Sequence, residues 1–420
     1  MKSDPFALKS SAPLVDTSKA MPRDGEAGTP VGYAALIERA EALVPLIAEN
    51  AAEAERIGRT PDLVVAAMRD AGLFRMVRPS AFGGYAQPPE ILFDVCSIVA
   101  RGCMSTAWVL ANLAVHELYM ALWPRHVQEE VWSNPDTLIG STFVFPAGRA
   151  NKVEGGYIVN GRWPFSSGIH PCDWTINGAI VAGEDGSPPS QRYFLLSRDQ
   201  YDILDTWHTE ALRGTGSTDV AATDAFVSED RTLGYVDLVQ GKAPGLDVHS
   251  EASVRFPFSV MGGFVLLSAV YGSARGAYER FVEEAKTKIT KSSGKGLAAE
   301  PTFQSKVAEA GALLDAVEAL VRRNFADMNE VIAKNEPFTG RMAFRMRRDA
   351  SFCAKLTAEA ADLIFALNGG SALYKSNSVQ RMWRDVHGGV AHIVFQWDVH
   401  GVASGKVDLG IPSGMPGMLV

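Results

Sequence analysis

The sequence predicts an α+β protein in which a helical domain, a β-domain and a helical bundle follow one another. Three observations predict this class. Apolar residues recur at helical spacing from Tyr33 to about residue 121, the period falls to two after Pro135, and helical spacing returns from about Phe258. The lack of βαβ alternation and of a GxGxxG or GxxxxGK[ST] turn argues against a Rossmann or P-loop enzyme. The expected boundaries are an arm (1–32), a helical domain (33–136), a β-domain (137–240) and a C-terminal bundle (241–420).

The N-terminal part begins with a segment that lacks periodicity and has no apolar core of a signal peptide, so we expect a mobile arm. A helix is predicted from Tyr33 to Ile47. A second helix is predicted over 61–71, because Pro61 suits a first helical turn and Gly72 suits a stop. The long apolar stretch 90–121, interrupted near Gly102, predicts two buried helices.

The β-domain is predicted from dense turn signals. Gly155-Gly156 and Asn160-Gly161 bracket three apolar residues, which predicts short antiparallel strands joined by tight hairpins. Further strands are expected at 173–182, 192–197, 201–206 and 218–227, and together they predict an antiparallel barrel or sandwich. The C-terminal part predicts a four-helix bundle from segments 260–288, 302–334, 340–367 and 378–403.

Composition limits the possible partners. The net charge of −8 and the pI near 5.6 argue against a nucleic-acid partner. No run of about 18 apolar residues is found, so we expect a cytoplasmic protein that does not bind a membrane. The cysteines, Cys96, Cys103, Cys172 and Cys353, form no CxxC pair, which predicts reduced buried thiols and no metal site.

Three motifs carry a resemblance that covers nearly the whole chain after Tyr33. They are Phe82-Gly83-Gly84, the turn Leu212-Arg213-Gly214-Thr215-Gly216-Ser217, and Met382-Trp383-Arg384-Asp385. With the order of helices, β-domain and bundle, they resemble the acyl-CoA dehydrogenase superfamily. The resemblance implies that fold, and a homotetramer whose sites are completed by a second chain.

Within the superfamily, the sequence looks most like the two-component flavin-dependent hydroxylases, a group that includes p-hydroxyphenylacetate 3-hydroxylase. The dehydrogenases carry a catalytic glutamate shortly after the Arg-Asp pair, whereas residues 384–392 contain none. Ser105-Thr106-Ala107-Trp108 followed by His116, and Phe165-Ser166-Ser167-Gly168, match the hydroxylases. The resemblance implies hydroxylation of a phenolic or indolic molecule through a C4a-hydroperoxyflavin, with FMNH2 from a separate NAD(P)H:flavin reductase and O2 as co-substrate; FAD is the less expected flavin.

The resemblance assigns three catalytic residues. Ser167 is expected to hydrogen-bond the flavin N5, although a strand-ending turn explains the same residues. His116 is expected to take the phenolic proton, although a lone histidine on an apolar helix face is also compatible with a satisfied core residue. His392, expected within the last helix, resembles a histidine that reaches the flavin region. A metal held by His387, His392 and His400 is disfavoured by their spacing on one helix.

Other residues are expected to line the flavin or the substrate. Trp108 is expected to pack on the flavin or wall the pocket, unless it is simply a core tryptophan. Phe165 and Ser166 are placed at the flavin with Ser167. Ser141 and Thr142 align with a serine that the hydroxylases place against the substrate oxygen, and Thr142 is also expected at the cofactor.

The cofactor phosphate needs cations or backbone N–H groups. Lys288 falls where the hydroxylases have an arginine, although a solvated charge explains it equally. Gly370-Ser371 and Arg384 are expected to serve the cofactor from a second subunit.

Substrate contacts are expected from the start of the bundle. Phe258 and Phe143 favour a flat, weakly polar phenol or indole. Ser259 stands where the p-hydroxyphenylacetate enzyme presents an arginine, which weakens the case for a carboxylate-bearing substrate, unless Arg255 reaches in by a shifted loop.

Three alternative functions stay open. A nitrogen- or sulfur-oxygenating monooxygenase of the same fold would need no base for a phenol. An acyl-CoA dehydrogenase would need the missing glutamate. A scaffold without catalysis would only oligomerise through its bundle.

Overall fold

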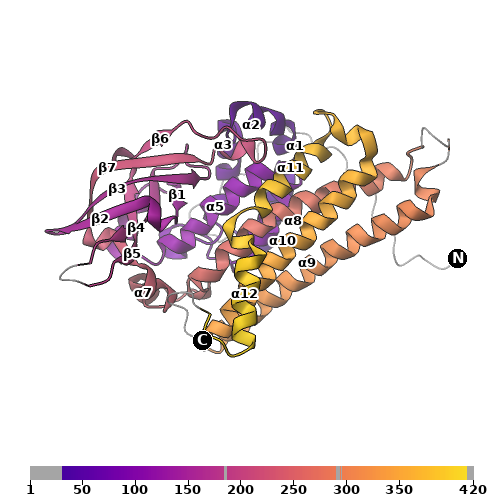
Figure 1. Cartoon of the computed structure of the whole chain (residues 1–420). Helices are drawn as coiled ribbons and strands as arrows, with labels where there is room; N and C mark the ends of the chain where they lie inside the picture. The colour runs from indigo at the N-terminus through magenta and orange to yellow at the C-terminus, as the bar shows by residue number, and fades with distance from the viewer. Residues whose placement is uncertain (1–30, 184–186, 290–293, 295, 414–420) are drawn as a thin grey trace.

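The computed structural model describes residues 31–183, 187–289, 294 and 296–413. The predicted arm therefore lies almost wholly outside the described residues. Figure 1 shows the sheet at one end of the molecule, the long C-terminal helices at the other, and α5 running between them. The predicted order of helices, strands and helices is confirmed.

The N-terminal part that the structure describes consists of six α-helices, and one of them, α5, is buried on nearly every side. They are α1 (Tyr33–Glu49), α2 (Ala51–Ile57), α3 (Asp62–Asp70), α4 (Glu90–Ala100), α5 (Met104–Met120) and α6 (Arg125–Val131). Every residue of α5 except Asn112 is buried, because the helix is apolar around its circumference and packs on α4, α8 and the sheet. Polar groups on α5 must therefore find partners inside the protein.

The Phe82-Gly83-Gly84 motif has a physical reason in the backbone. Gly83 ends a short 3-10 helix with φ +74°, in the left-handed region that favours glycine. A Cβ at Gly84 would lie 2.0 Å from the carbonyl oxygen of Arg78. Only glycine allows this close crossing, which folds the segment back on Arg78.

The central sheet is mixed, not antiparallel throughout. Its order is β6-β7-β3-β2-β4-β5-β8, with β1 added on β4. β4 pairs in parallel with both β1 and β2, and the other pairs are antiparallel. The strands are β1 (Ile139–Thr142), β2 (Gly148–Val153), β3 (Gly156–Ser166), β4 (Trp174–Val181), β5 (Ser190–Ser197), β6 (Asp202–Leu204), β7 (Thr218–Ser228) and β8 (Thr232–Gly234).

One of the two predicted hairpin turns is wrong. The turn at Gly155-Gly156 joins β2 and β3 as expected. Asn160-Gly161 lies inside β3, where the pairing with β7 shifts register between Val159 and Gly161. A β-bulge uses the same residue types as a turn, because an extra residue also needs a permissive backbone.

The bundle consists of α8 (Phe258–Ala285), α9 (Pro301–Ala333), α10 (Gly340–Asn368), α11 (Ser378–Val390) and α12 (Trp397–Asp408); a short helix, α7 (Tyr235–Val239), precedes it. The single helix predicted over 378–403 is wrong, since it is broken between α11 and α12. His392 lies at the break with extended backbone angles, and its Nδ1 accepts the Val394 N–H, which caps the 3-10 helix η11 (Ile393–Phe395).

Helix α8 is the core of the bundle. By length and composition it could cross a membrane, but 72% of its most apolar window is buried inside the protein. It packs against α4, α5, α10 and α11. Its apolar character is therefore accounted for by contacts within the fold.

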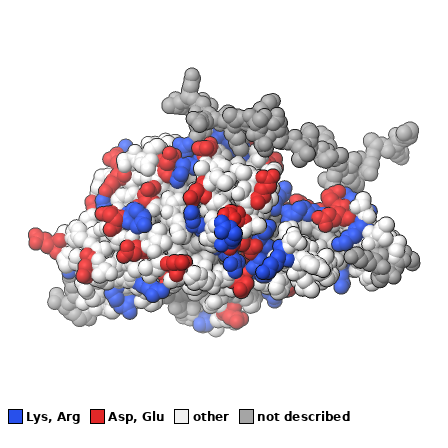
Figure 2. All heavy atoms as spheres, turned by 90° about the horizontal axis from the view of Figure 1, so that it is seen from above, with Lys and Arg blue, Asp and Glu red and all other residues white. Residues whose placement is uncertain are grey.

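On the face shown in Figure 2, acidic and basic side chains intermingle, so neither positive nor negative charge dominates that face.

Candidate active site

His116 on α5 is held by a hydrogen bond on each ring nitrogen. Its Nδ1 lies 2.5 Å from the carbonyl oxygen of Ile139, and its Nε2 lies 2.7 Å from Ser141 Oγ. Because a carbonyl oxygen only accepts, Nδ1 must carry the proton of the neutral ring. Nε2 is then the basic nitrogen, and it accepts from the Ser141 hydroxyl.

Burial sets the protonation state of His116. The residue is 2% exposed. Desolvation lowers its pKa to about 4, and the hydrogen bond to Ile139 opposes this only in part. At pH 6 to 8 the ring is therefore neutral, with a fixed tautomer and a free lone pair whenever Ser141 gives way.

Of the two adjacent hydroxyl residues, only Ser141 meets His116. The Thr142 hydroxyl donates instead to the Ser141 carbonyl oxygen, 2.8 Å away. Successive strand residues point to opposite faces, so the side chains of Ser141 and Thr142 diverge. The structure thus supports the substrate-side prediction for Ser141 and gives Thr142 a local backbone contact.

Aromatic rings surround the imidazole. The Phe143 ring lies 6.4 Å from His116 and 4.9 Å from Tyr193 of β5, measured between centroids. Phe258, at the start of α8, contacts Tyr119, Phe143 and Tyr193 at 4.5, 5.8 and 5.6 Å. We call His116, Tyr119, Phe143, Tyr193 and Phe258 the aromatic pocket group. Its rings come from α5, β5, α8 and the segment after β1.

A second polar group begins at Trp108, on the same helix. Trp108 Nε1 donates to Ser167 Oγ (3.1 Å), which lies 2.7 Å from Ser217 Oγ; Ser217 Oγ lies 2.6 Å from Thr215 Oγ1. Thr215 donates its only hydroxyl proton to the Leu212 carbonyl oxygen. The protons must therefore run from Ser167 to Ser217 to Thr215, so the Ser167 oxygen keeps a lone pair that can accept one more donor.

The residues before Ser167 differ in their surroundings. Phe165 has φ +65° and is 63% exposed, with its ring edge-on to Trp207. An exposed aromatic ring in a strained backbone conformation is typical of a functional site. Ser166 is fully buried, and its hydroxyl has no hydrogen-bond partner among the described residues; it lies near Gly140 of β1.

His392 lies against the Trp108 ring, edge-on at 5.7 Å between centroids. Since its Nδ1 accepts the Val394 N–H, its Nε2 carries the proton in the neutral ring. The ring keeps some exposure, but enough protein surrounds it that burial lowers its pKa to about 4. The predicted neighbours Trp108, Ser167 and His392 are therefore brought together.

Helix α5 connects the two groups. Trp108 and His116 are separated by about 12 Å along the helix, given a rise of about 1.5 Å per residue. Between them Gly168, with φ +70°, lies against Val109 and Leu113, where a Cβ would be 2.7 Å from Val109 Cγ1. The turn that carries Ser167 can approach α5 only because residue 168 is glycine.

Arg384 and Asp385 fasten α11 to the turn that carries Thr215. Asp385 is buried and accepts the Leu212 N–H at 2.7 Å, and burial raises its pKa to about 6. Arg384 pairs with Glu55 at 2.6 Å and donates to the Glu210 carbonyl oxygen. Within this chain Arg384 is thus a structural contact, and its role toward a cofactor stays a prediction.

The predicted phosphate residues lie at the opposite end of the bundle. Lys288 follows α8, and Gly370-Ser371 lie in the 3-10 helix η10 (Gly369–Leu373) after α10. The ends of these helices meet in a small apolar cluster of Phe281, Ala285, Phe303 and Leu367. The structure gives neither segment a contact with Ser167, so their role also stays a prediction.

Ser259 lies one residue beyond Phe258, where α8 begins, and is half-buried. Arg255 is exposed, at the end of a 3-10 helix over Ala252–Arg255. A reach of Arg255 toward a substrate would need a shifted loop and stays a prediction.

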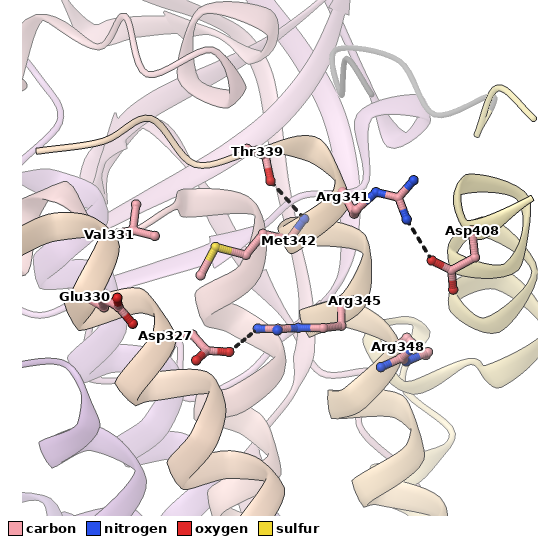
Figure 3. Close-up of a pocket in the computed structure, with 9 residues that line it drawn as sticks. All are labelled: Asp327, Glu330, Val331, Thr339, Arg341, Met342, Arg345, Arg348 and Asp408. Carbon is pink, nitrogen blue, oxygen red and sulfur yellow. Dashed lines mark hydrogen bonds and ion pairs between the residues drawn. The ribbon is translucent and has the colours of Figure 1, made fainter. Parts of the chain in front are cut away.

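A cavity of about 440 Å³ lies elsewhere, and residues of α9, α10 and α12 and the segment before α10 line it (Figure 3). Its charged side chains largely pair with one another: Arg345 binds Asp327 and Arg341 binds Asp408. None of the predicted site residues lines it.

In the described part of the chain, no group of three His, Cys, Asp or Glu residues is arranged to hold a metal ion.

Several residues of the site escaped prediction. Thr215 and Ser217 were contained in a motif that indicated only a turn, and the register that aims their hydroxyls at Ser167 is a tertiary property. Tyr119 and Tyr193 are ordinary apolar positions by spacing. Tyr119, three residues after His116, is one helical turn away, which is the single sequence signal that could have suggested it.

Comparison with known proteins gives consistent results. Residues 264–397 match the family model described as acyl-CoA dehydrogenase, C-terminal domain. The chain is 32% identical to the oxygenase subunit HsaA of a flavin-dependent monooxygenase from Rhodococcus jostii, over 90% of this chain and 98% of that protein. It is 31% identical to the oxygenase component of an FADH2-dependent resorcinol hydroxylase from Rhizobium, over 90% and 94%. The crystal structure of 3-HSA hydroxylase from Rhodococcus sp. RHA1 superposes with a TM-score of 0.85 at 31% identity, covering 91% of this chain and 99% of the other.

Proposed function

This chain belongs to a family of flavin-dependent monooxygenases, the oxygenase components that have the acyl-CoA dehydrogenase fold. On that premise we propose that it hydroxylates a phenolic or indolic small molecule at a ring carbon next to the hydroxyl or N–H group of that molecule. One atom of O2 enters the ring and the other leaves as water. The observation that carries the proposal is His116, a buried neutral imidazole whose basic nitrogen faces Ser141 next to packed aromatic rings.

His116 and Ser141 are positioned to bind a phenol oxygen. The phenol O–H would donate to His116 Nε2, and the Ser141 hydroxyl, released from that nitrogen, would donate to the phenol oxygen. With a pKa of about 4, the ring takes the proton only as negative charge develops on that oxygen, because a neighbouring anion raises the imidazole pKa. Removing the proton makes the carbon ortho to the oxygen more electron-rich, as electrophilic oxygen transfer requires.

The aromatic rings serve orientation and dryness. Phe143 lies beside the His116 ring and Phe258 packs on Phe143, so both would offer apolar faces to an aromatic substrate. Excluding water strengthens the hydrogen bonds of His116 and Ser141, and it protects reactive intermediates in the active site from hydrolysis.

The group at Trp108 fits a reduced flavin. The Ser167 oxygen retains a lone pair, which suits the N5–H of a reduced isoalloxazine. Trp108, His392 and the exposed ring of Phe165 provide flat surfaces beside it. When bound, reduced flavin supplies the two electrons that activate O2 for transfer.

We propose FMNH2 as the cofactor, supplied by a separate NAD(P)H:flavin reductase because the sequence has no nicotinamide-binding fingerprint. We also propose a homotetramer, in which Gly370-Ser371 and Arg384 would serve a neighbour's cofactor and Lys288 would bind a cofactor phosphate.

An acyl-CoA dehydrogenase is disfavoured by chemistry. Such an enzyme needs a carboxylate base, and residues 384–392 offer only Asp385, which is buried and bonded to the Leu212 N–H. The basic group that the pocket does offer is the imidazole of His116, which suits a phenol or an indole N–H.

The proposed function is tested by turnover. The protein is mixed with a generic NADH:flavin reductase, either FMN or FAD, and air, and is then given a phenol, its methyl ether or an aryl sulfide. We expect an ortho-hydroxylated product from the phenol and none from the ether, which has no proton to give His116. Sulfoxide formation without phenol hydroxylation would contradict the proposal.

Replacing Ser167 with alanine is expected to uncouple oxygen use from hydroxylation. The loss of one hydrogen bond costs about 1 kcal/mol, so the hydrogen peroxide released per product should rise about five- to tenfold. The readout is peroxide and product measured in the same reaction. Ser97→Ala is the control, because Ser97 on α4 bonds the Ser268 carbonyl oxygen on α8, away from Ser167. Equal coupling in both variants would remove Ser167 from the mechanism.

A further inference from the structure

Two buried tyrosine hydroxyls in the aromatic pocket group lack partners. Tyr119 is 5% exposed and Tyr193 is 3% exposed. Neither hydroxyl forms a hydrogen bond with any residue that the structure describes, and neither oxygen is fully enclosed by protein atoms. Since buried polar groups are nearly always paired, two unpartnered donors in the group around His116 call for an explanation.

Other buried tyrosines show the usual pattern. Tyr201 donates to the Cys172 carbonyl oxygen at 3.0 Å, and Tyr271 donates to Glu318 at 3.0 Å. The missing partners of Tyr119 and Tyr193 are therefore particular to the pocket.

Tyr119 lies beside His116, with ring centroids 5.8 Å apart, and Tyr193 lies beyond Phe143. Phe143 contacts His116 on one side and Tyr193 on another, and Phe258 contacts both tyrosines. A ligand ring held at His116 and Ser141 would thus have Tyr119 and Tyr193 as its other polar neighbours.

The electrostatics favour donation by these hydroxyls. Burial raises the pKa of both tyrosines above the usual value of 10, so both stay protonated at neutral pH. Arg347 of α10 lies near Tyr193 and Tyr235, and its positive charge acts on both. The pocket wall thus combines two O–H donors with a nearby cation, which suits an acceptor oxygen and suits an anionic one best.

We infer that Tyr119 and Tyr193 bind a second oxygen group of the substrate, distinct from the phenol oxygen that His116 and Ser141 hold. The substrate class is a phenol that carries an acceptor oxygen, a carboxylate or a ketone, on a short chain away from the reacting hydroxyl. Arg347 favours the carboxylate. This assignment rests on the proposed function. The cation in this assignment is Arg347, and it differs in position from the arginine that the p-hydroxyphenylacetate enzyme has where this chain has Ser259.

The test is a binding titration on the full-length protein with FMN present. Three matched probes are used: 3-(4-hydroxyphenyl)propionate, 4-(4-hydroxyphenyl)butan-2-one and 4-propylphenol. For the unmodified protein we expect the propionate to bind most tightly, then the ketone, then propylphenol. Tyr193→Phe and Tyr119→Phe should each weaken the two oxygenated probes about five- to tenfold and leave propylphenol unchanged.

A structural role for the hydroxyls is separated by Tyr201→Phe. This control removes a partnered hydroxyl, so it should lower the unfolding temperature, whereas Tyr193→Phe should not, because its hydroxyl has no described partner to lose. If all three probes bind alike, or if the phenylalanine variants keep the preference, the inference fails while the proposed function stands. If none of the phenols binds, both fail.

Discussion

Replacing His116 with asparagine is expected to lower kcat/KM for phenol hydroxylation by about 10²-fold or more, the usual cost of losing a general base. Asparagine can still donate to the Ile139 carbonyl, but it cannot take a proton. Flavin oxidation by O2 should continue, so the electrons should appear as hydrogen peroxide. The measurement is product and peroxide under saturating reduced flavin.

The matched control for this substitution is His249→Asn. His249 is also buried, at 5% exposure, and its Nε2 bonds Gln128 Oε1 at 2.7 Å. We expect turnover of this variant to stay near that of the unmodified protein. Ser141→Ala should fall between the two, at about tenfold, because it removes one neutral hydrogen bond. An H116N variant within about fivefold of the unmodified protein would rule out a base at this position.

Breaking the Arg78–Glu117 pair is expected to lower the free energy of unfolding by about 3–5 kcal/mol, because the remaining charge is left buried and unpaired. The pair is bidentate, with N–O distances of 2.6 and 3.1 Å, and its side chains are 1% and 0% exposed. Arg78 also donates to the Pro135 carbonyl oxygen, so it ties the entry of the β-domain to α5 beside His116. Urea or thermal unfolding of Glu117→Gln measures the effect.

Two further variants interpret that result. Replacing both partners with apolar residues, Arg78→Met with Glu117→Leu, should restore much of the stability, since no charge then stays buried. Glu279→Gln removes solvent-accessible pairs with Arg101 at 3.8 Å and with Arg275 at 3.1 Å, and should cost less than about 1 kcal/mol. A Glu117→Gln loss as small as that of Glu279→Gln would show that the buried pair is not a main support of the fold.

The domain order could be predicted because each part has a strong period. Helix α5 and helix α8 are apolar over most of their surface, and only a buried helix in a large protein tolerates this. The apolar pattern over residues 378–403 predicted one helix, but the chain is broken between α11 and α12, because the His392 side chain caps a backbone N–H there. Such a cap replaces a helical hydrogen bond without changing the apolar pattern.

The mixed pairing of the sheet could not be read from the sequence. Strand β4 lies between β2 and β5 and also pairs with β1 in parallel, although β1, β2 and β3 all precede it along the chain. Residue spacing within a strand gives its faces but not its neighbours.

The site was predicted in part because two of its residues share one helix. Trp108 and His116 both lie on α5, so their spacing survives folding unchanged. The partners of His116 lie on β1 and those of Ser167 near Thr215, and they meet only through tertiary contacts. The choice between Ser141 and Thr142 depended on which face of β1 meets α5, which neighbouring hydroxyls cannot reveal.

The most direct test of the account is the reductase-coupled reaction run under ¹⁸O2 with a phenol and its methyl ether, followed by mass spectrometry of the products. We expect a single ¹⁸O atom in the ring of the phenol product, ortho to the original hydroxyl, and no labelled product from the ether. Unlabelled phenol product, or an ether hydroxylated as fast as the phenol, would contradict oxygen transfer to a ring held by His116.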